Sequence, residues 1–321
     1  MKSISLLTIL IFLIWDPLLA QPGKTISGKS QAKLLSFSND TAVSGADLNA
    51  EKAAFYSDVD TGISMRPLKR SNRIALVIGN EDYLTHQKDP TTVANVKFAL
   101  NDAKMFSRYA SDLLGIEESN ILAFYNATAK EMASGIDTAV KLAMDIGEEA
   151  EVIFYYAGQG TPDELTGYPY LLPVDVSVSD LEGAVGLFDI YDRLKAAKPG
   201  KVTLILDACF NRGGRSDKPG PEPDGMIAPF MGDIHDNFVL FSAVSGNQSA
   251  LSYDQQQHGL FTYYFLKKLK ETSGKATYEE MDEYLKREVS NTAVQLLQKK
   301  QEPEIKAGRN IEQSWHGWSF D

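Results

Sequence analysis

The chain has 321 residues, one cysteine, and a formal charge of −11 from 32 Lys and Arg against 43 Asp and Glu. This ordinary globular composition leaves room for one large or two small domains, while an acidic balance without a Lys/Arg cluster disfavours nucleic acid as a partner. A single cysteine excludes an internal disulfide framework and any multi-cysteine metal site.

Residues 1–20 have the features of a secretory signal peptide. Lys2 is a short basic start, an apolar run follows at 4–15, and the small residue Ala20 precedes Gln21 where cleavage would fall. The run is shorter than the roughly twenty residues that a membrane span needs. We therefore expect a secreted or periplasmic protein with no membrane span after signal removal; an uncleaved anchor is the alternative.

The next segment, residues 21–70, is rich in Ser, Gly, Asp, Lys and Ala and has weak periodicity. This composition predicts a linker or loosely ordered arm. Residues 71–310 carry the regular pattern of one domain, and 311–321 are expected to form a C-terminal tail.

Short apolar runs alternate with helical patterns along this domain. Strands are expected at 74–78, 121–125, 152–156, 202–206 and 238–241. Helices are expected at 99–113, 128–146, 187–197, 259–269 and 277–298, the second and the last opened by Thr/Glu capping boxes. This alternation predicts an α/β fold with a mostly parallel central sheet and helices on both faces.

Two strand ends could hold chemistry, because ligands of open α/β sheets bind beyond the carboxyl ends of the strands. The third strand is expected to lead into a glycine-flanked turn, Gly158-Gln159-Gly160, and the fourth ends at Cys209. A base about fifty residues before a cysteine nucleophile is the caspase spacing. Without further motifs, a lone cysteine here is more often a buried small hydrophobe.

Further motifs make the chain resemble the caspase and metacaspase-like cysteine peptidases, especially bacterial secreted members, over about residues 73–308. They are ALVIGNEDY (75–83), LNDAKMF (100–106), FYYAGQGTPDE (154–164), YLLPVD (170–175), LILDACF (204–210), FSAVSGNQSALSY (241–253), HGLFTYYFLKKL (258–269) and QEPEIKAG (301–308). The resemblance implies a three-layer caspase-like fold and a Cys–His dyad that cleaves peptide bonds through a thioester.

By this resemblance Cys209 is the nucleophile, and the backbone N–H groups of Cys209 and Gly160 form the oxyanion hole. Asp207 matches an acidic residue that selects a basic side chain, and Asp102 matches a second. Together they imply a preference for Arg or Lys. For Asp102, an exposed helix carboxylate is the alternative.

The resemblance also implies a groove-lining loop from Ser245 to His258, with Tyr253 among its substrate-binding residues. Residues 211–236 match a variable connection that is cleaved in some relatives; a plain surface loop is the favoured alternative. No His/Cys/Asp cluster has metal-ligand spacing, so no metal or cofactor is expected. Calcium activation, known in some metacaspases, is not assigned to any residue.

One departure bears on function: the family's Gly-His-Gly, whose histidine is the general base, reads Gly-Gln-Gly here, with Gln159 at its centre. A glutamine amide cannot take a proton from a thiol at neutral pH. Loss of general acid–base help typically costs about 10²–10⁴ in rate. Asn211-Arg212 after Phe210, where relatives commonly have Ser-Gly, is a second departure.

Three functions remain open. The favoured one is an inactive or strongly weakened pseudopeptidase that binds a peptide or protein, with Arg or Lys at the docking position. The alternative is an active endopeptidase, cleaving after Arg or Lys, with a substitute base. His258 is the best candidate base, although orienting the following helix is its more expected role. A secreted structural or adhesion protein is the third.

Overall fold

The computed structural model describes residues 57–66, 68–87, 93–210, 234, 237–246 and 248–321. The predicted signal peptide, most of the predicted linker and almost all of the 211–236 connection lie outside these residues. Among the described residues, no helix is both long and apolar enough to cross a membrane.

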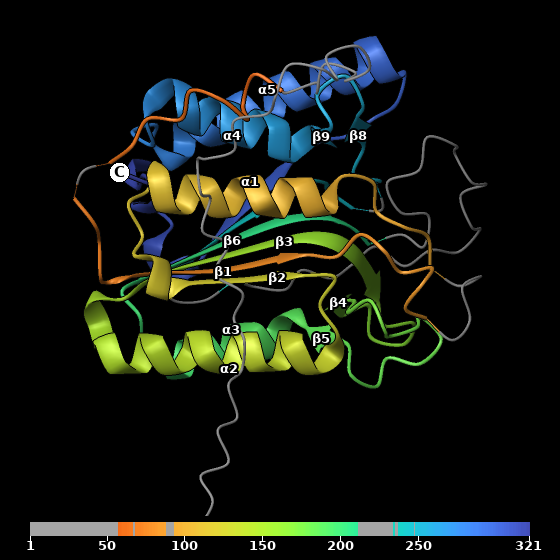
Figure 1. Ribbon diagram of the computed structural model, residues 1–321, viewed down its shortest axis with the longest axis horizontal. Helices are drawn as coiled ribbons and strands as arrows, with labels where there is room; N and C mark the ends of the chain where they lie inside the picture. Colours follow the sequence, from red (N-terminus) through yellow and green to blue (C-terminus); the bar gives the residue numbers. More distant parts are fainter. Residues whose placement is uncertain (1–56, 67, 88–92, 211–233, 235–236, 247) are drawn as a thin grey trace, which may run out of the picture. The chain divides into compact units, whose positions relative to one another are not determined.

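A mostly parallel sheet forms the centre of the described part, with strand order β10-β7-β6-β3-β1-β2. Figure 1 shows strands β6, β3, β1 and β2 of this order side by side. Strands β7 to β2 of this order are parallel, and β10 is an antiparallel edge on β7. The strands of this path are β1 (Arg73–Gly79), β2 (Ile121–Tyr125), β3 (Glu151–Pro162), β6 (Lys201–Cys209), β7 (Phe238–Ser242) and β10 (Glu304–Ala307).

Among the described residues, four shorter strands lie outside this path. Strand β4 (Pro169–Leu171) pairs with the far end of β3 and with β5 (Val185–Gly186). Strands β8 (Ser252–Tyr253) and β9 (His258–Gly259) form a separate hairpin. We call it the β8–β9 hairpin.

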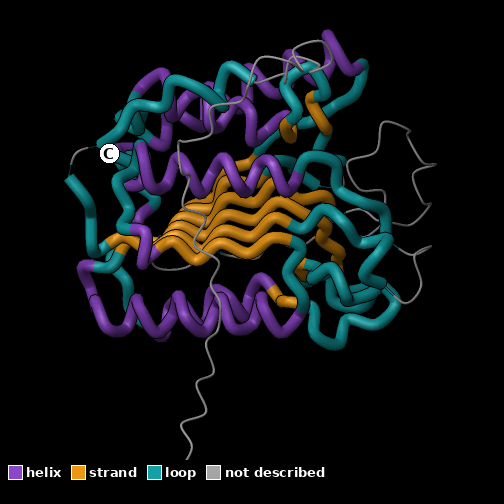
Figure 2. Tube along the Cα trace, in the orientation of Figure 1, coloured by secondary structure: helices purple, strands orange, loops and turns teal. Residues whose placement is uncertain are grey.

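Helices cover both faces of the sheet (Figures 1 and 2). The longer elements are α1 (Ala99–Asp112), α2 (Ala129–Ile146), α3 (Leu187–Ala196), α4 (Leu260–Thr272) and α5 (Tyr278–Leu297), and the 3₁₀ turns are Glu118–Asn120, Gly147–Glu149, Arg309–Ile311 and Trp315–Gly317. Helices α1, α4 and α5 share one core with one face of the sheet, and α2 and α3 share a second core with the other. The predicted three-layer arrangement is confirmed.

Local sequence accounts for two helix starts and for one close approach between a helix and a strand. Thr128 with Glu131, and Thr277 with Glu280, form the two predicted capping boxes at the starts of α2 and α5. Gly79 lets α1 lie tightly against β1, because a Cβ at this position would come 2.5 Å from the Cβ of Ala103 and 2.6 Å from the carbonyl oxygen of Ala99.

Two details differ from the sequence-based expectations. Strand β3 does not turn after Tyr156 but continues to Pro162, because its far end pairs with β6 on one side and β4 on the other. Gly158-Gln159-Gly160 is therefore strand, not turn. The expected tail is packed, since Phe320 is buried in the core and its carbonyl accepts a hydrogen bond from buried Arg73.

Candidate active site

Strands β3 and β6 bring Gln159 and Cys209 side by side. Their parallel register pairs the two residues directly, and side chains at paired positions of parallel strands point to the same face. Cys209 belongs to the core shared with α1, α4 and α5. Gln159 and Cys209 are fifty residues apart in sequence but lie on adjacent strands, near the carboxyl ends of both.

The Cys209 thiol is buried, with 1% of the residue exposed. Its sulfur accepts a hydrogen bond from the backbone N–H of Ala250 at 3.1 Å, and the thiol donates to the carbonyl oxygen of the same residue at 3.4 Å. Ala250 belongs to the loop after β7 that was predicted to line the substrate groove. In this structure that loop lies against the thiol.

Because the loop lies against the Cys209 thiol, we expect the thiol to react slowly with alkylating reagents. Both hydrogen bonds to Ala250 must break before a reagent reaches Cys209, and each contributes about 0.5–1.5 kcal/mol. We expect iodoacetamide to alkylate the folded protein at least about tenfold more slowly than the unfolded chain at the same pH. Equal rates, after correction for thiol ionisation, would contradict a closed site.

Gln159 is held on both its side chain and its backbone. Its side-chain amide Nε2 donates to the carbonyl oxygen of Ala94 at 3.0 Å. Its backbone N–H donates to the Tyr83 hydroxyl at 2.9 Å, and its carbonyl accepts from the Tyr156 hydroxyl at 2.6 Å. Position 159, where the sequence predicts the family's histidine to stand, thus holds a buried amide that has no proton-accepting nitrogen.

Gly160, the second predicted oxyanion-hole residue, lies against the ring of Phe210. A Cβ at Gly160 would come within 2.6 Å of two ring carbons of Phe210, so only glycine fits here without a shift. The role of its N–H in oxyanion binding stays a prediction.

The imidazole of His258 lies between two carboxylates and is fully buried. Its Nδ1 is 2.8 Å from Asp102 Oδ1, and its Nε2 is 2.9 Å from Asp60 Oδ1. Burial by itself lowers the pKa of His258, but hydrogen bonds and charge from Asp102 and Asp60 outweigh it and raise the pKa to about 9. At neutral pH the ring is therefore an imidazolium, which cannot accept a proton from a thiol.

The two carboxylates predicted to select a basic side chain both hold the start of α4. Asp102 accepts from the backbone N–H of Gly259, and Asp207 accepts from the N–H and the hydroxyl of Thr262 at 3.1 and 2.6 Å. Both aspartates are fully buried. The alternative that Asp102 is an exposed helix carboxylate is therefore wrong, because its partners lie in the interior.

The other two predicted groove residues lie on the loop and its hairpin. Ser245 is half-buried, and its carbonyl accepts a backbone hydrogen bond from Gln248. Tyr253 pairs with His258 in the β8–β9 hairpin and packs edge-on against Tyr263, with ring centroids 5.2 Å apart. Their substrate-binding roles stay predictions.

Three residues that hold this region had no role predicted from sequence. Buried Gln301 bridges the loop, since its amide donates to the carbonyl of Ala243 and accepts from the N–H of Leu251. Tyr83 fixes the backbone of Gln159. Asp60 lies within the predicted loose arm. Gln301 and Tyr83 lie in motifs shared with the family, and only this membership could have pointed to them from the sequence. No sequence pattern marks Asp60.

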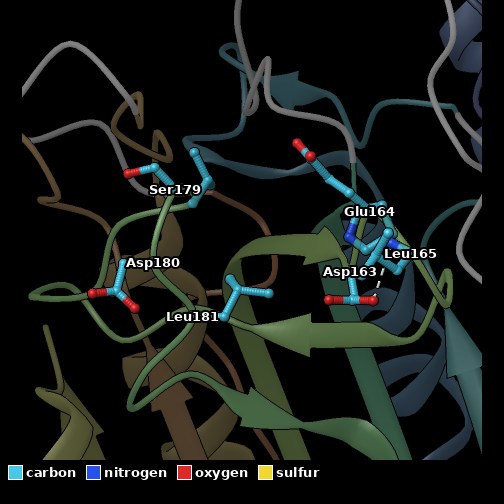
Figure 3. Close-up of a pocket in the computed structure, with 8 residues that line it drawn as sticks. Asp163, Glu164, Leu165, Ser179, Asp180 and Leu181 are labelled. Carbon is cyan, nitrogen blue, oxygen red and sulfur yellow. Dashed lines mark hydrogen bonds between the residues drawn. The ribbon is translucent and has the colours of Figure 1, made fainter.

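A cavity among the described residues lies away from the thiol, beyond the end of β3 (Figure 3). It measures about 660 Å³, and Figure 3 shows residues 163–165 on one side and 179–181 on the other. Asp163, Glu164 and Asp180 make it acidic, but Cys209 and Gln159 do not line it. The cavity thus does not open onto the thiol.

Metal binding has no candidate centre in the part of the chain that the structure describes. No group of three or more His, Cys, Asp or Glu side chains is placed there to hold an ion. Calcium activation therefore stays without assigned residues.

Comparison with known proteins agrees with this fold. A family model described as the caspase domain matches residues 72–312. Caspase-1 from Spodoptera frugiperda is similar in structure (TM-score 0.52, 12% identity, 80% of this chain and 94% of that chain), as is protein GSU0716 from Geobacter sulfurreducens (TM-score 0.51, 17% identity, 74% and 93%). These likenesses concern the fold. No curated protein matches the sequence.

Proposed function

Because the chain belongs to the caspase-domain family, we propose that it is a secreted caspase-like pseudopeptidase, which binds a peptide or protein without cleaving it. The observation that carries this proposal is Gln159, whose buried amide occupies the position next to Cys209 where the family's base is expected. A thiol of ordinary pKa, about 8.5, is only a few per cent thiolate at neutral pH without such a base.

Substitute bases find little support among the described histidines. Both ring nitrogens of His258 contact carboxylates. His86 is exposed, with its Nδ1 2.7 Å from the carbonyl oxygen of Asp82, and His316 stacks on Trp315 in a turn near the C-terminus. His235 lies outside the described residues.

Burial of Cys209 supports the same proposal. Cleavage needs a thiolate within about 3–3.5 Å of a scissile carbonyl, but the sulfur contacts the backbone of Ala250 instead. A binding role needs no such access.

We propose a ligand with Arg or Lys at its docking position. A formal charge of −11 attracts cationic segments over distances of about the Debye length, roughly 8 Å at physiological salt. Because Asp102 and Asp207 have internal partners, their carboxylates would have to exchange those partners to bind a basic side chain directly.

The test is hydrolysis of fluorogenic peptides ending in Arg or Lys by the mature protein, with and without calcium, beside Cys209→Ala and Gln159→His. We expect the wild type to match Cys209→Ala. Hydrolysis by the wild type that Cys209→Ala abolishes would overturn the proposal and identify an active peptidase. Hydrolysis by Gln159→His alone would show that the nucleophile is competent and that only the base is missing.

Binding is measured separately on Cys209→Ala, which cannot turn over a ligand. Fluorescence anisotropy with labelled peptide libraries that carry Arg, Lys or uncharged residues at one position tests the ligand chemistry. We expect the Arg and Lys peptides to bind more tightly than the uncharged ones, and their affinity to fall as salt is added. Equal affinity for all three libraries would exclude a preference for a basic residue at the docking position.

A further inference from the structure

Residues 57–60 contact the β8–β9 hairpin at two places. The Ser57 hydroxyl donates to Gln256 Oε1 at 2.7 Å, in the turn of the hairpin. Asp60 Oδ1 lies 2.9 Å from Nε2 of His258, the first residue of β9. We call residues 57–60 the arm segment. It precedes residues 72–312, which the family model matches.

The arm segment is itself fixed to α1 and α4. Val59 is buried, and its carbonyl accepts from the Tyr109 hydroxyl at 2.7 Å. Arg108 of α1 donates to the carbonyl of Asp60 at 3.1 Å, and Lys270 of α4 donates to the carbonyl of Asp58 at 2.6 Å. The segment is therefore a strap between two helices and the hairpin.

The hairpin in turn continues directly into the residue that contacts the thiol. Tyr253 pairs with His258, and Ser252 pairs with Gly259. The N–H of Leu260 donates to the carbonyl of Leu251 at 2.8 Å. The next residue toward the N-terminus is Ala250, whose backbone contacts Cys209 Sγ.

A second set of hydrogen bonds holds the same loop independently of the arm segment. Gln301 bridges Ala243 and Leu251, and Gln248 exchanges hydrogen bonds with Glu302 through Nε2 and Oε1. These contacts do not involve the hairpin. Loss of the arm contacts should therefore loosen residues 250–258 without unfolding the domain.

We propose that Asp60 is a positioning residue of the thiol site: through His258 it holds the β8–β9 hairpin, and thereby Ala250, in place over Cys209. Release of the arm segment would then uncover the thiol. This inference concerns access to Cys209, whether or not the chain cleaves peptides.

The test compares Asp60→Asn with Asp58→Asn in the full mature chain. Both substitutions remove one negative charge from the arm segment, but the Asp58 side chain is mostly exposed and lies 3.5 Å from Lys267 on the surface. A hydrogen bond to a charged group is among the stronger ones in proteins, so we expect Asp60→Asn to raise the rate of Cys209 alkylation about tenfold to a hundredfold. Asp58→Asn should leave the rate within about twofold of the wild type.

Hydrogen exchange by mass spectrometry distinguishes a local from a general effect. We expect faster exchange in Asp60→Asn for peptides covering 250–259, with β1 and β3 unchanged. Uniformly faster exchange would overturn the proposal, because Asp60 would then act only on global stability. Equal alkylation rates in the two variants would overturn it as well.

Ser57→Ala is a second, milder variant should Asp60→Asn fail to fold. It removes the hydroxyl that donates to Gln256 and accepts a longer hydrogen bond, 3.5 Å, from the N–H of Val59, and the His258 contacts remain. We expect alkylation and exchange at 250–259 to accelerate in the same direction by a smaller factor. Unchanged alkylation in Ser57→Ala, with no folded Asp60→Asn, would count against the proposal.

Discussion

Replacement of Asp102 by alanine is expected to lower the free energy of unfolding by about 3–5 kcal/mol, the range for removing one partner of a buried ion pair. The carboxylate is fully buried, 2.8 Å from Nδ1 of His258 and 3.0 Å from the N–H of Gly259. Alanine leaves the imidazolium with one carboxylate and leaves the N–H of Gly259, at the start of α4, without this acceptor. Urea unfolding at pH 7, followed by circular dichroism, measures the loss.

The matched control lies on the same helix. Asp112 makes a solvent-facing ion pair with Arg108 at 3.3 Å, one turn apart, and Asp112→Ala should cost no more than about 1 kcal/mol. Similar losses in the two variants would show that the carboxylate of Asp102 contributes no more than a surface charge does.

Stability is expected to fall between about pH 6.5 and pH 8 because of His258. Its pKa is about 9 in the folded protein against 6.5 as the ordinary value. The folded state therefore binds the proton more tightly, and its stabilisation is complete below pH 6.5 and is lost as the pH rises toward and through 9. A difference of this size corresponds to about 3 kcal/mol in total, of which about 2 kcal/mol is lost by pH 8.

Lys201 sets the upper end of this window. Burial, as the largest cause, lowers the pKa of Lys201 from 10.5 to about 8. Its folded state binds the proton less tightly than the unfolded chain, so Lys201 adds stability as the pH rises from about 8 to 10.5 and offsets His258 there. Urea midpoints at pH 6.5 and 8, at equal ionic strength, isolate the His258 contribution.

An NMR titration of the His258 ring measures its protonation state directly in the folded protein. We expect its resonances to remain those of an imidazolium at pH 8. Titration near pH 6.5, with no fall in the urea midpoint, would show that the two carboxylates do not hold the ring in its charged form.

The sequence was sufficient for the architecture because local signals and burial agree along most of the domain. Continuous apolar runs predict strands buried on both faces, as strand β1 is at every residue, and the helix starts at Thr128 and Thr277 are where the residues place them. Strand β10 has no continuous apolar run. Its residues lie half-buried at the sheet edge, where polar side chains are tolerated, so the sequence does not predict it. The two strands of the β8–β9 hairpin have two residues each, too few to form a recognisable pattern in the sequence.

For the site, sequence alone determined which chemical groups are present: one thiol, Cys209, and the amide of Gln159, at the position where the resemblance predicts an imidazole. Tertiary structure decided what those groups contact. Whether a carboxylate faces a ligand or an internal partner depends on elements far apart in the chain, as with Asp102 and His258, which are 156 residues apart. The closure over Cys209 and the strap from Asp60 arise in the same way, because hydrogen bonds between distant segments leave no periodicity in the sequence that forms them.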